Sequence, residues 1–233
     1  MRVLFFVLVC AFISSCSLRP AEPSPYIKDA YKLEDHDILQ KVWKSEDFRK
    51  EKYTKIAIKP VSTKFLRRLG WWDKKHALAY DDSGVFPGMK RNDTNVDMAD
   101  NFSKYFTEEI NKEFKKSKLN QLQWVNHYAA DSQTMVLHIE VIELVPVKKY
   151  FIGLGLLGDG SLKGGTMAIE GHLREGRTNK LLGMFTDRKI DRISDFSENT
   201  KISWYSHCKP LIKEWSEEFV KLANLKIHRG DGD

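Results

Sequence analysis

The sequence predicts an α+β domain in two layers, a mostly antiparallel sheet of about five strands with two main helices packed on one face. Two observations carry this prediction. Several stretches of strand length are rich in Val, Ile, Leu and aromatic residues, and two longer segments repeat apolar residues at three- and four-residue spacing. Their order is a strand, a long loop, a helix, four strands and a helix. This order favours a sheet with its helices gathered on one side.

The first sixteen residues have the form of an export signal that ends in a cysteine. An arginine at position 2 precedes the apolar stretch 3–13, which is too short to span a bilayer but suits the core of a signal peptide. The stretch ends in Ile-Ser-Ser-Cys, which is similar to the lipobox of bacterial lipoproteins. We therefore predict that residues 1–15 are removed and that the Cys16 thiolate takes a diacylglycerol. An ordinary cleaved signal peptide with an accidental cysteine, or a short anchor, is the alternative.

The residues after Cys16 indicate where the protein goes. By resemblance to bacterial lipoproteins, an aspartate at position 17 would favour the inner membrane, whereas the serine found there permits the outer membrane. Several acyl chains anchor a protein stably, at about 0.8 kcal/mol per buried methylene group. Residues 16–25 contain three prolines and are expected to form a semi-extended spacer. We expect a lipid-anchored protein on the periplasmic face of the outer membrane.

Residues 26–225 are expected to form the single domain, followed by a frayed tail at 226–233. The segment before residue 53 is charged and weakly patterned, with at most a short helix at 37–43. Alternating isoleucines within 53–60 predict a strand that ends at a proline. The segment 62–93 has no hydrophobic period and is expected to be a long loop or insertion.

Two helices and four further strands follow. Thr94 or Asn95 can cap the first helix, and its apolar stripe consists of Ala99, Phe102, Phe106, Ile110 and Phe114. Strands are predicted at 122–128 and 134–145, and a half-buried hairpin at 166–174 and 180–191, with Glu170 and His172 on its polar side. The last helix is predicted at about 202–224, with its start delayed or kinked by Pro210. Cys208 falls on the apolar stripe of this helix, so we expect a buried structural thiol.

Four of these segments together are similar to one protein family. They are Ser-Pro-Tyr-Ile-Lys-Asp-Ala-Tyr-Lys-Leu at 24–33, Tyr-Thr-Lys-Ile-Ala-Ile-Lys-Pro-Val at 53–61, the hairpin at 168–189, and the tryptophan-containing last helix. This combination resembles bacterial lipoproteins of the family called domain of unknown function 3313 (DUF3313). The family is uncharacterised, so the resemblance implies an envelope location and a fold class but no reaction.

Charge and cysteine usage narrow the partners. The formal net charge is +6, which suits anionic lipid headgroups, lipopolysaccharide phosphates or acidic protein surfaces. The export signal argues against nucleic acid as a partner. If Cys16 is acylated and Cys10 leaves with the signal, only Cys208 remains, and the mature chain forms no intramolecular disulfide.

An apolar, glycine-broken connection is the main candidate for a contact with a partner or membrane. Two lysines precede large apolar residues where turn residues are expected, and such patches usually mark contacts. A wide loop folded over the core is the alternative. Trp71 and Trp72 are a second candidate, as a platform for carbohydrate or a lipid interface, and burial of one of them is the alternative. The candidate residues of the connection are Lys148, Lys149, Phe151, Ile152, Leu154, Leu156 and Leu157.

No pattern in the sequence indicates catalysis, a metal or a cofactor. The Gly-Leu-Gly-Leu-Leu-Gly at 153–158 leads into another strand rather than a helix, so we expect no dinucleotide there. The histidines lack metal-ligand spacing. Asp187, Arg188, Asp191 and Arg192 end the hairpin and are expected to form solvated pairs.

We expect a non-enzymatic binding or assembly component of the envelope with a protein partner there. An accessory subunit of a trans-envelope, secretion-type complex is one alternative. An envelope hydrolase or cell-wall ligand binder is another, and a cavity lined by paired carboxylates or histidine would favour it.

Overall fold

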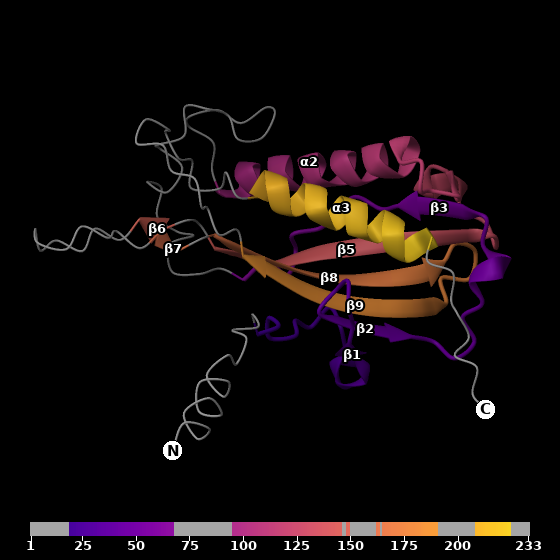
Figure 1. Cartoon of the computed structure of the whole chain (residues 1–233), viewed down its shortest axis with the longest axis horizontal. Coiled ribbons are helices and arrows are strands. Elements are labelled where there is room, and N and C mark those ends of the chain that lie inside the picture. The colour runs from indigo at the N-terminus through magenta and orange to yellow at the C-terminus, as the bar shows by residue number, and fades with distance from the viewer. Residues whose placement is uncertain are drawn as a thin grey trace, which may run out of the picture.

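The structure is a computed structural model that describes residues 19–67, 95–145, 148–149, 162–163, 165–190 and 208–224. In these ranges two helices lie side by side on one face of a seven-stranded sheet (Figure 1). The helices are α2 (Asn95–Lys116) and α3 (Cys208–Asn224). The predicted class, two-layer α+β with two main helices on one face, is confirmed.

The main sheet is mostly antiparallel, as predicted, and its strands run in the order β1-β2-β9-β8-β5-β3-β4. Only β3 pairs in parallel, with β5 on one side and β4 on the other. A separate two-stranded sheet pairs β6 with β7. The bounds are β1 (Glu34–Asp35), β2 (Lys41–Lys44), β3 (Lys55–Ile58), β4 (Gln123–Trp124), β5 (Thr134–Val145), β6 (Lys148–Lys149), β7 (Leu162–Lys163), β8 (Thr166–Glu175) and β9 (Leu181–Ile190).

The prediction of a short helix at 37–43 is wrong, because strand β2 begins within this segment and β1 lies just before it. β2 pairs with β9, and β1 with β2, which raises the strand count of the main sheet from about five to seven. Val42 packs on the main core, whereas its neighbour Trp43 packs on the opposite side of the sheet. A strand with apolar residues on both faces does not alternate, so its hydrophobic period is lost.

The start of the predicted loop 62–93 is packed against the sheet. Ser62 forms an isolated parallel bridge with Glu140 of β5, and the amide of Arg67 donates to the carbonyl of Ile142 at 3.0 Å. This short segment therefore continues the line of β3 along β5. Residues 68–93 of the predicted loop lie outside the described residues.

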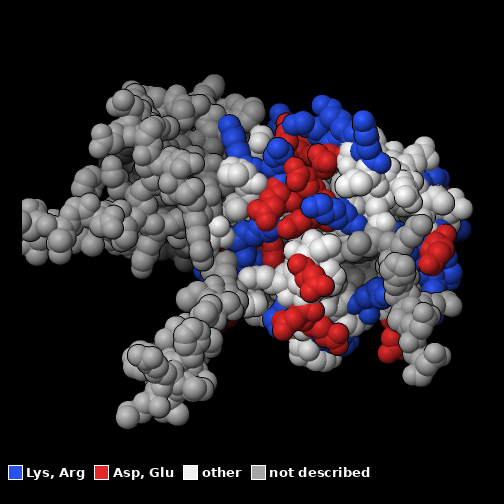
Figure 2. Space-filling view, viewed as in Figure 1, with Lys and Arg blue, Asp and Glu red and all other residues white. Residues whose placement is uncertain are grey.

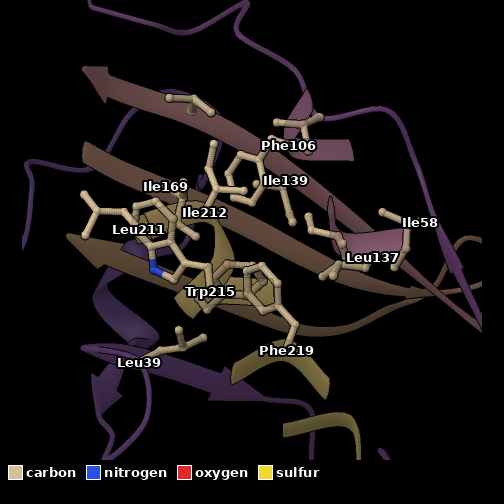
Figure 3. Packing of buried hydrophobic residues seen from close by; sticks show 14 of the residues in the cluster. Leu39, Ile58, Phe106, Leu137, Ile139, Ile169, Leu211, Ile212, Trp215 and Phe219 are labelled. Atoms are coloured by element: carbon tan, nitrogen blue, oxygen red, sulfur yellow. The ribbon is translucent and has the colours of Figure 1, made fainter. Parts of the chain in front are cut away.

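The main core lies between the helices and the sheet (Figure 3). The five residues of the predicted α2 stripe are all buried. The Trp215 ring of α3 stacks on the Phe106 ring of α2, with ring centroids 5.9 Å apart. Pro210 falls in the first turn of α3, where its missing N–H costs nothing. Cys208 is fully buried, as predicted.

The opposite face of the sheet is covered by the N-terminal segment, residues 19–33 (Figure 1). Ala21 is buried against Ile142 and Ala168, and Ile27 and Leu33 are buried against Met184. The described part of the expected spacer is therefore packed, because these small and apolar side chains have a surface to cover. For the same reason β8 is buried on both faces rather than half-buried.

Candidate functional site

An apolar cavity of about 250 Å³ lies on the helix side of the sheet, near the carboxyl ends of both helices. Phe114 of α2 and Phe219 and Leu222 of α3 supply part of its wall, and the start of β5 supplies its floor with Met135 and Leu137. Strands β2, β8 and β9 and the segment around Leu39 and Phe48 close its side. The fold brings these residues together from distant parts of the chain.

Several walls of the cavity remain partly open to solvent. Val42, Phe48, Leu173, Leu222 and Ala223 pack on the core but are only partly buried. Apolar side chains that remain partly exposed to solvent in a concave pocket are the usual lining of a binding site for an apolar ligand. The cavity is therefore the strongest ligand-site candidate in the described part of the chain.

The polar groups of the cavity lining are basic. Lys44 and His36 are exposed, and Lys50 is half-buried. Burial lowers the pKa of Lys50, and the neighbouring carboxylate of Glu51 acts in the opposite direction. No aspartate or glutamate is among the described residues that line the cavity. The lining thus combines an apolar wall with cationic groups.

A second group of polar side chains lies under the N-terminal segment, on the other face of the sheet. The backbone N–H of Ser24 donates to Glu170 Oε1 at 2.7 Å, and its hydroxyl donates to Glu170 Oε2. The Tyr26 ring stacks on the His172 ring at 4.4 Å between centroids. The amide of Phe65 donates to Glu140 Oε1 at 2.6 Å. Glu140, Glu170 and His172 are all buried.

Burial dominates the electrostatics of this polar layer. It raises the pKa values of the Glu140 and Glu170 carboxyls, although their hydrogen bonds act the other way. It lowers the pKa values of His138 and His172 to about 4, with Arg174 adding to both shifts. The two histidines face each other across β5 and β8. Because Ser24 and Tyr26 cover Glu170 and His172 and Phe65 lies against Glu140, these three buried side chains present no open site.

The charged end of the hairpin is not a set of solvated pairs. Asp187 is buried and accepts a hydrogen bond from Trp215 Nε1 at 2.6 Å and another from the backbone N–H of Gln40 at 2.8 Å. Arg188 Nη2 pairs with the buried Glu143 at 2.6 Å. Asp191 and Arg192 lie outside the described residues. The prediction is wrong for Asp187 because α3 packs over it.

Most of the residues predicted as a contact surface lie outside the described residues, as does Cys16. Lys148 and Lys149 form β6, where they pair with Lys163 and Leu162 of β7. The predicted residues outside the described ranges are Trp71, Trp72, Phe151, Ile152, Leu154, Leu156 and Leu157. The structure therefore leaves this contact surface as a prediction.

Acidic and basic side chains are mixed over the described surface (Figure 2), and the described residues form no metal-binding group. Figure 2 shows acidic and basic side chains interleaved over the helix side of the domain. Within the described ranges, no three histidine, cysteine, aspartate or glutamate side chains are placed to hold a metal ion. The helices of the described ranges include none that is both long and apolar enough to cross a membrane.

The comparisons with known proteins give remote likenesses. No family model matches the chain, so the resemblance to DUF3313 has no support there, and no curated protein matches. PelC from Paraburkholderia phytofirmans, solved as a dodecamer, is similar at 10% identity and a TM-score of 0.39, over 79% of this chain and 96% of that one. Protein XCC0632 from Xanthomonas campestris, of the bacterial family DUF330, is similar at 10% identity and a TM-score of 0.40, over 78% and 89%.

A third similar structure is the hypothetical protein CT253 from Chlamydia trachomatis, at 11% identity and a TM-score of 0.38, over 73% of this chain and 98% of that one. Likenesses of this order transfer no site or activity. The structural neighbours thus include a bacterial domain of unknown function, and the finer assignment to DUF3313 rests on the sequence motifs alone.

Proposed function

We propose that this protein is a lipid-anchored, non-enzymatic binding component of the bacterial envelope, held on the periplasmic face of the outer membrane by Cys16 and belonging with DUF3313-like lipoproteins. The observation that carries the binding role is the cavity. Its walls are apolar, and its polar groups are two lysines and the exposed His36, a lining suited to holding an apolar ligand. His36 alone does not make a hydrolytic site, because its Nδ1 accepts from the Ile38 backbone N–H at 3.1 Å and no aspartate or glutamate is among the described lining residues.

The position of the carboxylates supports binding over hydrolysis. A hydrolase needs acid and base groups within reach of its substrate. In the described chain Glu140, Glu170 and His172 lie on the face of the sheet opposite the cavity. Ser24 and Tyr26 of the N-terminal segment occupy the carboxylate of Glu170 and the ring face of His172, and the Phe65 amide donates to Glu140.

The packed N-terminal segment supports a close tie between anchor and domain. Ala21 is already buried on the sheet, five residues after Cys16. Five residues span at most about 17 Å. A lipid on Cys16 would therefore hold the covered face of the sheet near the membrane, with the helix side turned elsewhere.

Labelling of the full chain with radioactive palmitate, followed by separation of inner and outer membranes, tests the anchor. The variant Cys16→Ala is expected to take up no label and to leave the outer-membrane fraction. Cys208→Ala is the matched control, since it removes a cysteine but keeps the lipobox, and it should label like the wild type. Equal labelling of wild type and Cys16→Ala would overturn the proposal.

A further inference from the structure

The size of the cavity limits its ligand to one chain of carbon atoms. An engineered apolar cavity of about 150 Å³ holds one benzene ring, which has six carbons. In proportion, the cavity of about 250 Å³ has room for about ten carbons. This accommodates a large part of one acyl chain but not the two chains of a phospholipid side by side.

The shape of the lining fits such a chain. The aromatic rings of Phe114, Phe185 and Phe219 and the branched side chains of Leu137 and Leu222 present only carbon to the space. An alkyl chain gains free energy there by leaving water and loses no hydrogen bond. A polar or sugar-like ligand would find too few partners and would lose its hydration.

The charge of the lining selects the headgroup. Lys44 and Lys50 are the lysines of the cavity, and no aspartate or glutamate is among its described lining residues, although Glu51 lies next to Lys50 outside the lining. Lys50 is half-buried and Lys44 is exposed, so a headgroup at the mouth of the cavity can reach both ammonium groups. A negatively charged headgroup beside a buried alkyl chain therefore matches the site better than a neutral or cationic one.

The chain's own lipid is poorly placed to fill the cavity. Ala21 packs on Ile142, seven residues along β5 from Met135 in the cavity floor. Seven strand residues span about 23 Å, and the two contacts lie on opposite faces of the sheet. An acyl chain on Cys16 would have to leave the membrane and pass around the sheet to enter.

From these four observations we propose that the cavity binds the single alkyl chain of an anionic amphiphile, with the anionic headgroup beside Lys44 and Lys50. A fatty acid and a lysophospholipid share this chemistry. The proposal rests on the proposed function only in that the envelope supplies such molecules, since the cavity argument itself does not depend on the anchor.

Photolabelling tests the proposal on the full lipidated chain in phosphatidylcholine nanodiscs. The probes are a diazirine-bearing decanoate, the alcohol of the same chain, and a lysophosphatidylglycerol with the same chain. We expect both anionic probes to label peptides from 41–50 and 208–224, and the alcohol to label them at least roughly fivefold less, the size of one surface charge pair. Labelling by only one anionic probe identifies the source of the ligand within the same chemistry.

Two variants locate the site. Lys44→Ala with Lys50→Ala should reduce labelling by the decanoate roughly fivefold, whereas Lys213→Ala, on the exposed part of α3, should leave it unchanged. Ala223→Leu adds carbon to the wall and should reduce labelling by all three probes, while the exposed Ala129→Leu should not. The double variant Lys44→Ala with Lys50→Ala, here called the rim variant, keeps the proposal testable if Ala223→Leu does not fold.

Three results would overturn the proposal. They are equal labelling by the alcohol and the decanoate, labelling that the rim variant leaves unchanged, and labelling that occurs only in Cys16→Ala, which would identify the chain's own lipid as the occupant. Membrane fractionation of the wild type is read separately. Loss of the anchor with retained labelling therefore contradicts the proposed location but not the ligand.

Discussion

Glu170, at the middle of the sheet, accepts hydrogen bonds from both the backbone N–H and the hydroxyl of Ser24, near the start of the described chain. Glu170 is fully buried, and burial raises the pKa of its carboxyl. A buried carboxylate is costly unless its oxygens are hydrogen-bonded. Ser24 therefore both satisfies Glu170 and fastens the N-terminal segment to β8.

The first prediction is that Ser24→Ala loosens this attachment. Removal of the hydroxyl leaves one oxygen of a buried carboxylate without its partner, so the free energy of unfolding should fall by about 1–3 kcal/mol. Urea denaturation measures the loss, and limited trypsin digestion at the exposed Lys28 should become faster. The exposed Ser132→Ala is the control and should change neither. If Ser24→Ala matched this control in both measurements, the hydrogen bond from the Ser24 hydroxyl would contribute nothing to stability.

The second prediction concerns Trp215, whose indole N–H donates to the buried Asp187. Trp215→Phe removes the donor and is expected to destabilise the domain by about 1–3 kcal/mol from the unsatisfied carboxylate, with a further loss from the smaller ring. Trp124→Phe is the matched control, because Trp124 makes the same kind of bond to Asn111 at 2.7 Å but is only half-buried. Water can replace that bond, so the control should cost less. A larger loss for Trp124→Phe would contradict the argument.

The sequence predicts the long elements well for physical reasons. β5 has the predicted bounds 134–145, because a long run of Val, Ile, Leu and Met suits a strand buried on both faces. α2 begins at Asn95, one of the two residues named as its possible cap, and every residue of its predicted stripe is buried. In contrast, β1 and β2 are two and four residues long and obtain their stability from β9. A pattern confined to so few residues cannot indicate a pairing with a strand far along the chain.

The candidate site could not be predicted for a similar reason. Each apolar residue of the cavity, such as Phe114 or Leu137, is indistinguishable in the sequence from an ordinary core residue. Only the packing of α3 against the sheet leaves a space beside them. The buried polar layer is also hidden, since Glu170 and His172 have the spacing of a solvent-facing side. The prolines of the N-terminal segment are typical of a spacer, so they do not predict that this segment covers Glu170 and His172.

The third prediction is a pH dependence that arises from His138 and His172. Their pKa values are lowered to about 4, mainly by burial, whereas an unfolded chain has values of about 6.5. Between these values the unfolded state binds more protons, so the free energy of unfolding should fall as the pH falls from about 6.5 to about 4. Lys59, Arg174, His172 and His127 add to the lowering of the His138 pKa, and Arg174 adds to that of His172.

Thermal unfolding between pH 7 and pH 4.5 measures this dependence. Glu140 and Glu170 have raised pKa values, so their contribution favours the folded state at the lower pH and opposes that of the histidines. The difference between wild type and His138→Gln with His172→Gln isolates the histidines. The melting temperature of the variant should fall less on acidification. Parallel curves for the two proteins would exclude the histidines as the cause.

The fourth prediction is that Cys208 reacts slowly with thiol reagents in the folded protein. Its side chain is fully buried at the start of α3, within the main core. A reagent must wait for the helix to open, so labelling should be slower by orders of magnitude than in denaturant. Quenched-time mass spectrometry of the full chain measures the rate. Reaction as fast as in denaturant would mean that the start of α3 does not pack as described.

The last prediction concerns Gly171 of β8, which lies directly opposite Phe185 on the neighbouring strand β9. A Cβ atom at Gly171 would lie 2.0 Å from the Phe185 ring, far closer than any real contact. Gly171→Ala must therefore displace a buried ring, and such overpacking costs about 1–3 kcal/mol.

A double-mutant cycle separates this clash from an effect of alanine on the strand itself. Phe185→Leu removes the ring and should be destabilising alone, because it also leaves space next to the core. In its presence the added methyl group has room, so Gly171→Ala with Phe185→Leu should be less destabilised than the sum of the two single changes. The coupling should lie between about 0.5 and 3 kcal/mol in the favourable direction. Strict additivity in urea denaturation would contradict it, because the glycine would then be required by the backbone and not by the ring above it.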